Sequence, residues 1–429
     1  MRMTGAYTNR KEFLFLQGPP GPFFSILGQE LVRHGAGVYR INLCGGDRYD
    51  WREGAIDYRG LKQNWPLFFD RFVRDHKITD LVLYGDCRPM HQAALRLAQL
   101  RGIHVHVFEE GYIRPDWMTL ERDGVNGHST FERDPAIIMA AAKWLPVVPK
   151  QPPITACFNR RARDSYWHYH HVVTGKLRFP FYRSHRQGSI MVDGIGWILR
   201  FWRKPRRAEL AKRTLKEIEG RKYFLFPLQL SGDYQIRAHS PFTSMRMAAD
   251  YVLESFARYA PEDSVLLVKE HPFDTSFLSW CAFLKRRARK LGIADRVHYI
   301  DGGDLKKLSE QSAGMVCVNS TSGTLGLDVG IPVIVLGDAV YDVPGVTHQG
   351  GLDRFWSAPE RPDPELYEAF KKVLHAKCLV RGGYASESAT RILLRNSLNR
   401  LLWEDPISRV PVTTLAGNQE EGTSPASSR

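Results

Sequence analysis

Short apolar runs alternate with amphipathic segments along most of the chain, and Gly- and Pro-rich turns separate them. An apolar run at residues 13–18 precedes helical apolar spacing at 23–33, and a second apolar run follows at 38–43. The same order recurs at 78–85, about 91–101 and 105–111. Strand–helix–strand repeats of this kind predict a parallel sheet.

A second series of apolar runs lies at 222–227, 264–271, 296–301, 314–320 and 332–337, with helical segments between them. Runs that lack alternation are typical of strands covered by helices on both faces. We therefore expect a second doubly wound domain. Its ligands should bind at the carboxyl ends of the strands.

The length of 429 residues exceeds what one hydrophobic core usually serves. The sequence therefore predicts an α/β fold with two Rossmann-like domains facing across a cleft. We expect a first domain at 1–150, a basic aromatic insertion and linker at 151–220, a second domain at 221–380, a bracing helix at 381–405 and a disordered tail at 406–429.

The net charge of +14 favours an anionic partner, which can be a nucleic acid, a lipid surface or a substrate. Much of the excess is local, because residues 158–207 hold twelve Lys or Arg against two acids. No apolar run is long enough to span a membrane, and the first ten residues lack a secretory signal. These absences predict a cytoplasmic protein.

Two motifs in the second series follow strands. His271, in Lys269-Glu270-His271-Pro272, should project from a strand end, where it can hydrogen-bond a phosphate. Asn319-Ser320-Thr321-Ser322 precedes a helical run, so its hydroxyl and N–H groups form a candidate phosphate cradle. Alone, each motif also fits a structural histidine or a helix cap. Together they indicate a nucleotide pocket, to which Gln229, Asp233 and Gln235 can add contacts with a ribose or a base edge.

The first series ends in a run that carries two adjacent acids, Phe108-Glu109-Glu110-Gly111-Tyr112. Consecutive strand residues point to opposite sides, so we expect one acid to face the cleft. Such a carboxylate can act as a nucleophile or base towards an anomeric carbon, and a surface ion pair is the structural alternative. Nearby side chains that can contact substrate are Asp86, Arg88, Arg114, Gln17 and Gly18.

The sequence does not call for a metal. The six cysteines are scattered without a Cys-x-x-Cys pair, and no Cys or acid with ligand spacing accompanies His168, His170 and His171.

Taken together, these motifs closely resemble the capsule polysaccharide biosynthesis family, specifically its KpsS/LipB-like β-Kdo transferases. The likeness covers roughly residues 13–403. The motifs that carry it are Phe15-Leu-Gln-Gly-Pro19, Gly21-Pro-Phe-Phe24, Tyr39-Arg-Ile-Asn42, Gly45-Gly-Asp47, Tyr84-Gly-Asp-Cys-Arg-Pro89, Phe108-Glu-Glu-Gly-Tyr-Ile-Arg-Pro-Asp-Trp117, Gln235-Ile-Arg-Ala-His-Ser240, Glu270-His-Pro272 and Asn319-Ser-Thr321.

The resemblance implies a GT-B glycosyltransferase that moves Kdo from CMP-β-Kdo to lyso-phosphatidylglycerol, with retention, and so begins the poly-Kdo linker of a capsule glycolipid. It implies work at the inner face of the cytoplasmic membrane, near the other linker transferase and the capsule export machinery. His271 and Pro272 then bind the donor, with Ser320 to Ser322 as the phosphate loop. The related Glu-Asp-Gly motif is here Glu109-Glu110-Gly111, which leaves the nucleophile open between two glutamates. We favour Glu110.

In this hypothesis Arg88 or Arg114 holds the Kdo carboxylate, with Glu109 and Asp86 as the other catalytic candidates, and no cofactor is needed. The basic aromatic stretch is expected to contact the anionic membrane through Arg203, Lys204, Arg206 and Arg207. Two alternatives remain. One is a nucleotide-sugar epimerase of similar fold. The other is a nucleic-acid-binding protein, which the acids among the strand-end motifs disfavour.

Overall fold

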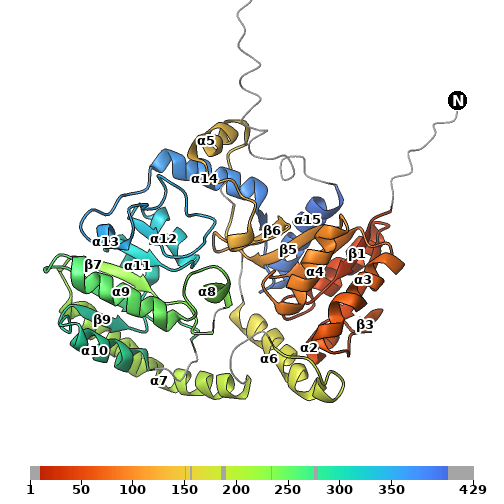
Figure 1. Ribbon diagram of the computed structural model, residues 1–429, viewed down its shortest axis with the longest axis horizontal. Coiled ribbons are helices and arrows are strands. Elements are labelled where there is room, and N and C mark those ends of the chain that lie inside the picture. Colours follow the sequence, from red (N-terminus) through yellow and green to blue (C-terminus); the bar gives the residue numbers. More distant parts are fainter. Residues whose placement is uncertain are drawn as a thin grey trace, which may run out of the picture. The chain divides into compact units, whose positions relative to one another are not determined.

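The computed structural model describes residues 10–149, 151–154, 157–184, 190–232, 234–274 and 279–403. The chain divides into two compact units (Figure 1). Unit 1 comprises residues 1–130, 147–185 and 374–410, and unit 2 comprises 131–146, 186–373 and 411–429. In the part of the chain that is described, no helix combines the length and the apolar character needed to cross a membrane.

Unit 1 contains a seven-stranded sheet in the order β12-β6-β5-β4-β1-β2-β3. Its strands are β1 (Glu12–Phe15), β2 (Gly37–Asn42), β3 (Ala55–Asp57), β4 (Asp80–Tyr84), β5 (His104–Glu110), β6 (Trp117–Arg122) and β12 (Leu379–Arg381). The first five strands are parallel, as the strand–helix–strand pattern predicts. The last two run antiparallel to their neighbours, which extends the expected sheet by a hairpin and a late strand.

The turn from β5 into β6 depends on Gly111. A Cβ atom at this position would lie 2.1 Å from the carbonyl oxygen of Trp117, so no other residue permits this close approach without a shift. The chain therefore reverses directly after the two glutamates.

Helices cover both faces of the unit 1 sheet (Figure 1). Along β1 and the residue after it, the fully buried side chains of Phe13 and Phe15 join one hydrophobic cluster, and those of Leu14 and Leu16 join the other. The first cluster includes α1 (Phe23–Arg33) and α15 (Glu387–Leu402). The second includes α3 (Trp65–Asp75) and α4 (Pro89–Leu100). The shorter α2 (Gly45–Asp50), the longer α6 (Phe158–Thr174) and three 3-10 turns, η1 (Lys62–Asn64), η2 (Asn126–His128) and η3 (Gly175–Leu177), complete the unit.

Unit 2 contains a five-stranded sheet in the order β11-β10-β7-β8-β9, and all its strands are parallel. The strands are β7 (Tyr223–Pro227), β8 (Val265–Lys269), β9 (Val297–Ile300), β10 (Gly314–Cys317) and β11 (Val333–Val335). The helices are α5 (Pro135–Trp144), α7 (Ile190–Glu217), α8 (Tyr234–Ala238), α9 (Met245–Tyr259), α10 (Trp280–Lys290), α11 (Leu305–Glu310), α12 (Ser322–Asp328), α13 (Leu352–Phe355) and α14 (Pro364–Lys377), whose last turn belongs to unit 1.

The expected fold class is confirmed: each unit has a doubly wound α/β topology, and GT-B enzymes are built from two such units. The expected domain boundaries differ from the observed ones. Residues 131–146 belong to unit 2, where Lys372 donates to the carbonyl oxygen of Ala142 at 2.9 Å. Residues 374–403 belong to unit 1, where Lys11 donates to the carbonyl oxygen of Leu401 at 2.7 Å.

The stretch 151–220 is not one insertion, because α6 belongs to unit 1 and α7 belongs to unit 2. The expected disordered tail, 406–429, lies outside the described residues.

Candidate active site

Three of the sequence motifs in unit 1 meet at the carboxyl ends of β1, β4 and β5. In this sheet the strand order reverses between β1 and β4, which is where doubly wound sheets bind ligands. The Tyr84 N–H donates to the carbonyl oxygen of Gln17 at 3.1 Å, and the Gly85 N–H donates to that of Phe108 at 2.8 Å. These bonds hold the three strand ends side by side.

At this edge the Glu110 carboxylate contacts two cations and two hydroxyl groups. Its Oε1 atom lies 2.5 Å from Nη2 of Arg161 and accepts hydrogen bonds from the hydroxyls of Tyr84 and Tyr384. Arg114 adds a second cation 3.8 Å from Oε2. Burial alone would raise the pKa of Glu110, but the two guanidinium groups and the Tyr384 hydroxyl together outweigh it and lower the pKa below its ordinary value. Glu110 is therefore ionised at neutral pH.

Glu109 has a different environment, although it is the next residue along the strand. Its Oε1 atom accepts the backbone N–H of Glu110 at 3.0 Å. Burial, which is the largest effect, and the charges of Glu110 and Asp86 raise the pKa of Glu109 to about 7, against the lowering effects of the Glu110 N–H hydrogen bond and of Arg88. A carboxyl group with this pKa can exchange a proton near neutral pH.

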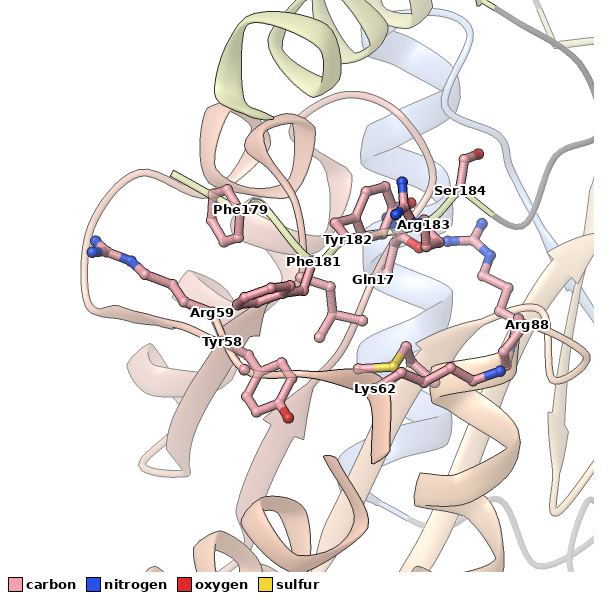
Figure 2. A pocket seen from close by; sticks show the side chains of 14 residues that line it. Gln17, Tyr58, Arg59, Lys62, Arg88, Phe179, Phe181, Tyr182, Arg183 and Ser184 are labelled. Atoms are coloured by element: carbon pink, nitrogen blue, oxygen red, sulfur yellow. The ribbon is translucent and has the colours of Figure 1, made fainter. Parts of the chain in front are cut away.

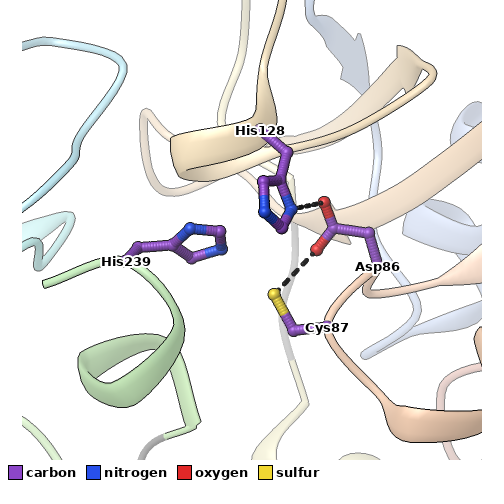
Figure 3. A group of neighbouring side chains, drawn as sticks. All are labelled: Asp86, Cys87, His128 and His239. Carbon is purple, nitrogen blue, oxygen red and sulfur yellow. Dashed lines mark hydrogen bonds and ion pairs between the residues drawn. The ribbon is translucent and has the colours of Figure 1, made fainter. Parts of the chain in front are cut away.

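Asp86 is 1% exposed and accepts hydrogen bonds from three donors: the Cys87 thiol at 3.1 Å, the Val125 N–H at 3.1 Å and Nδ1 of His128 at 3.0 Å. Figure 3 shows the His128 ring and the thiol meeting its two oxygens. These contacts tie the β4 end to the loop after β6. They give Asp86 a structural role, and its predicted contact with substrate stays a prediction.

Within unit 1, two described groups bring three possible metal ligands within 4.8 Å of one another. One is Asp86, Cys87 and His128, and the other is Cys44, Asp47 and His168. Asp47 already pairs with Arg40 at 3.4 Å, so a guanidinium supplies positive charge beside the second group.

The predicted substrate contacts of unit 1 lie in two places. Gln17 and Arg88 line a cavity of about 110 Å³, shown in Figure 2, whereas Arg114 is beside Glu110. The Gln17 side chain is 4% exposed, and its Nε2 donates to the Tyr182 hydroxyl at 3.4 Å. Gly18 is buried, and a Cβ there would meet the Phe24 ring at 2.7 Å, so packing accounts for this glycine.

In unit 2, His271 follows β8 at the expected strand end. Its Nδ1 atom accepts the backbone N–H of Phe273 at 3.1 Å, which fixes the ring and leaves Nε2 to carry the hydrogen in the neutral form. Pro272 is exposed, whereas Lys269 and Glu270 are each 6% exposed. Glu270 pairs with Arg207 at 3.6 Å and accepts the Tyr299 hydroxyl, so its carboxylate faces protein groups.

Gln229 and Asn319 follow β7 and β10, the two strands between which the strand order of unit 2 reverses. The Gln229 amide donates to Oδ1 of Asn319 at 2.8 Å and accepts the Asn319 N–H at 3.1 Å. Asn319 also donates to the carbonyl oxygens of Gln235 and His239. The two amides thus join the strand ends at the ligand-binding position, and Asp233 lies outside the described residues.

The candidate phosphate cradle is less open than the sequence suggested. The N–H groups of Ser322, Gly323 and Thr324 already donate to Oγ of Ser320, the carbonyl oxygen of Ser320 and that of Thr321. A phosphate would therefore meet the half-buried hydroxyls of the loop more readily than free N–H groups.

Of the four residues expected to contact a membrane, Arg206 is exposed and Arg207 is partly buried. Arg207 forms ion pairs with Glu270 and Asp301 in unit 2. The side chains of Arg203 and Lys204 lie outside the described part of the chain.

Sequence reasoning missed three residues that contact Glu110: Tyr84, Arg161 and Tyr384. They come from the end of β4, from α6 and from the loop after β12. Arg161 was visible only as one of many basic residues. Nothing in the local pattern joined Tyr384 to a strand end almost three hundred residues earlier.

Comparisons with known proteins point to the same family as the sequence motifs. The sequence profile described as "Capsule polysaccharide biosynthesis protein" matches residues 79–384. The Capsule polysaccharide export protein KpsS of Escherichia coli is 33% identical over 383 residues, which cover 87% of this chain and 97% of that protein. The Capsule polysaccharide modification protein LipB of Neisseria meningitidis serogroup B is 32% identical over 389 residues, covering 88% of this chain and 92% of that protein.

Among solved structures, a KpsC β-Kdo 2,7 transferase from Thermosulfurimonas dismutans is 13% identical, with a TM-score of 0.40. The match covers 84% of this chain and 89% of that one. The extent of the family profile and the near-complete coverage of the curated relatives lead to one conclusion. This chain is a member of the capsule polysaccharide biosynthesis protein family.

Proposed function

We propose that the chain is a retaining glycosyltransferase that moves the first β-Kdo residue from CMP-β-Kdo to lyso-phosphatidylglycerol. The product would begin the poly-Kdo linker of a capsule glycolipid. The observation that carries the proposal is the Glu109–Glu110 pair, in which neighbouring carboxyl groups at one strand end have pKa values shifted in opposite directions. Pairs of this kind can divide the tasks of a nucleophile and a base.

Glu110 is suited to the role of nucleophile because it stays ionised at neutral pH. Its carboxylate would attack the anomeric carbon of the donor as the bond to the CMP phosphate breaks, and CMP would leave with the bonding electrons. The acceptor hydroxyl would then displace Glu110 and give its proton to Glu109, which leaves the other face of β5 and would reach the hydroxyl around the same strand end. Two displacements at one carbon retain its configuration, as in retaining glycosidases.

Unit 2 is suited to bind the CMP part of the donor. The Nε2–H of His271 can donate to the departing phosphate, with the hydroxyls of Ser320 to Ser322 as further donors. The amides of Gln229 and Asn319 lie at the switch point of the sheet, the position where Rossmann-like units hold nucleotides.

We propose that the transfer needs no metal or other cofactor, because the sugar already carries its leaving group as a phosphodiester. The acceptor is a membrane lipid, so the enzyme would work at the inner face of the cytoplasmic membrane, beside the other linker transferase and the export machinery.

The test combines CMP-Kdo generated in situ with a fluorescent lyso-phosphatidylglycerol and detects a product heavier by one Kdo. Glu110→Gln should lower the rate at least about 1,000-fold, and His271→Ala should lower it by a smaller factor. Glu53→Gln, at an exposed glutamate of unit 1, is the matched control and should leave the rate unchanged. Full activity of Glu110→Gln would move the catalytic assignment to Glu109 or Asp86, and no product with the wild type would refute the proposed function.

A further inference from the structure

The cavity in Figure 2 lies beside the strand-order reversal of unit 1, and every described residue that lines it belongs to unit 1. Gln17 follows β1, Arg88 precedes α4, and Tyr182 and Arg183 lie in the segment after η3. Together with Leu43 and residues 58–62, these stretches, far apart in the sequence, form one pocket. The Glu109–Glu110 pair belongs to the neighbouring strand end, so the pocket is next to the proposed reaction centre.

The pocket has two chemically different sides. In Figure 2 the rings of Tyr58, Phe179 and Phe181 gather on one side, and the guanidinium groups of Arg88 and Arg183 lie on the other. A molecule that fits both sides has an apolar portion directly attached to a charged group.

The charge of the lining selects for an anion. Lys62, Arg88 and Arg183 line the pocket, and its described lining contains no acidic residue. Arg59 also belongs to the lining but pairs with Asp57 at 3.7 Å. Three cations around one small space repel one another unless an anion joins them, and arginine is well suited to bind phosphate.

Two further groups suit a phosphate. The first turn of α4, a twelve-residue helix, contributes to the lining, and helix N-termini carry partial positive charge. The Tyr182 hydroxyl accepts from Gln17, and burial raises its pKa above the ordinary value, so it keeps its own hydrogen. These groups add donors to the three cations.

The size of the cavity limits what enters it. At about 110 Å³ it is smaller than the roughly 300 Å³ at which pockets for drug-sized ligands begin. A phosphate-bearing headgroup fits this space, but a whole lipid does not. Phe181 is 49% exposed, and Leu61, which stands between two lining residues, is 40% exposed, so the rim offers apolar surface to an acyl chain outside.

We propose that this pocket binds the phosphate of a single-chain phospholipid, with Lys62, Arg88 and Arg183 around the phosphate and the acyl chain passing Leu61 and Phe181. The inference rests on the proposed function for the identity of that lipid as the acceptor. The Glu109–Glu110 pair defines where the reaction takes place, and the pocket adds a binding site for the acceptor.

The test is direct binding, without donor, of a short-chain lyso-phosphatidylglycerol below its micelle concentration. The double variant Lys62→Gln, Arg183→Gln changes two exposed side chains, so folding should survive, and heat denaturation checks this. It should bind the lipid at least about tenfold more weakly, because the phosphate loses two charge-assisted hydrogen-bond donors. Arg96→Gln, at an exposed residue of α4 outside the pocket, should bind like the wild type.

Three further probes identify the ligand. Glycerol phosphate should bind more weakly than the lipid but with the same dependence on Lys62 and Arg183. Phe181→Ser should weaken the binding of the lipid and leave the binding of glycerol phosphate unchanged. Lyso-phosphatidylcholine, whose headgroup is zwitterionic, should bind more weakly than lyso-phosphatidylglycerol.

Wild-type affinity of the double variant would overturn the proposal, as would an equal loss with Arg96→Gln. Inorganic phosphate that binds as tightly as the lipid would make this a free-phosphate site and refute the lipid assignment. Lipid binding that depends on the pocket without any Kdo transfer would support the site and refute the proposed function. Kdo transfer at a rate that the pocket variants do not change would support the proposed function and refute the lipid site.

Discussion

Glu109 and Glu110 are adjacent in the sequence, but their carboxyl groups have different environments. The two residues are adjacent on β5, so their side chains leave opposite faces of the strand. Arg161 and Tyr384 meet Glu110, whereas Glu109 has its neighbour's N–H group as a hydrogen-bond donor. Strand alternation thus explains why one carboxyl group has a lowered pKa and the other a raised one.

The raised pKa of Glu109 predicts the pH dependence of transfer. If Glu109 accepts the proton of the acceptor, it must be ionised, so kcat/KM should rise with pH through about 7 and then level off. Glu109→Gln should lower kcat by about 100- to 10,000-fold and abolish this rise. The measurement is the pH–rate profile of both proteins at saturating donor. An unchanged profile in Glu109→Gln would assign the base elsewhere.

Glu121 is a second carboxyl group with a raised pKa, and its effect is on stability. It is 6% exposed and accepts hydrogen bonds from the hydroxyls of Tyr112 and Ser129. Burial raises its pKa from 4.5 to about 7, against the lowering effect of these hydrogen bonds. Between these two pH values the folded state holds a proton that the unfolded chain has released. The free energy of unfolding therefore falls as the pH rises through this interval.

Because of Glu121, the free energy of unfolding should fall by about 3 kcal/mol between pH 4.5 and 7. Glu121→Gln cannot titrate, so the unfolding free energy of unit 1 should fall less steeply with pH in this variant. Denaturant titrations between pH 5 and 8 measure the slope, and Glu53→Gln, at an exposed site, should keep the wild-type slope. Parallel slopes for Glu121→Gln and wild type would contradict the assignment.

At the scale of elements, α6 supplies the cation that the strand pattern alone does not reveal. Its Arg161 pairs with Glu110, whereas Arg163, two residues later, is 63% exposed and lies 3.6 Å from Asp164. Helical geometry separates the directions of these two side chains. One helix therefore offers both a test residue and its control.

Arg161→Leu should raise the pKa of Glu110, since burial then acts against one guanidinium group fewer. The nucleophile would be less ionised at neutral pH and less well positioned, and kcat should fall by about 10- to 100-fold. Arg161→Lys should recover part of this loss, because it restores the charge but not the planar group. Arg163→Leu should match the wild type. Equal activity of both leucine variants would show that Arg161 does not act on the reaction.

The strand–helix rhythm predicts the parallel cores well, because buried parallel strands are continuous apolar runs and helices such as α1 keep a regular apolar spacing. It does not predict β6 or β12. The β6 sequence, Trp117–Arg122, mixes polar and apolar positions, and β12 has three residues that pair far away in the sequence. Strands of this kind depend on tertiary pairing, which local periodicity does not record.

The same limit applies to the candidate sites. Residues after apolar strands are predictable, since carboxyl ends of parallel strands share one edge of the sheet. Gln17, Glu110 and His271 were found in this way. The side chains that set their chemistry, such as Arg161 and Tyr384, come from a helix and a loop that tertiary packing brings to Glu110. Asp86 was predicted in the same way, and two of its three protein donors likewise come from groups that the local pattern does not connect to it.

At the scale of the whole molecule, the two units are not consecutive halves of the chain. Each unit is built from three separate stretches of the chain, so the chain passes between the units several times. Composition marked 151–220 as one segment because both α6 and α7 are basic and aromatic. Shared composition therefore does not mean shared packing, and this is why the expected boundaries differ from those of the two compact units.

The net charge of +14 predicts salt-sensitive binding to anionic vesicles. The basic residues at 203–207 are the predicted contact, but Arg207 pairs with Glu270 and Asp301. Reversing Arg207 would place three acids together, so the sharper variant reverses only Arg203, Lys204 and Arg206. Each cation near an anionic surface contributes about 1 kcal/mol, so this variant should bind vesicles at least about 100-fold more weakly.

The control must change the net charge equally at another surface. Reversing Arg71, Arg96 and Arg258 does this, since all three are exposed and none lies in the 203–207 segment. Sedimentation with vesicles that contain phosphatidylglycerol, repeated at rising salt, compares the two triple variants. A local contact predicts loss only in the first variant, because screening limits each charge to a distance of about 10 Å. Equal loss in both would mean that the overall charge, and not this segment, attracts the protein to the membrane.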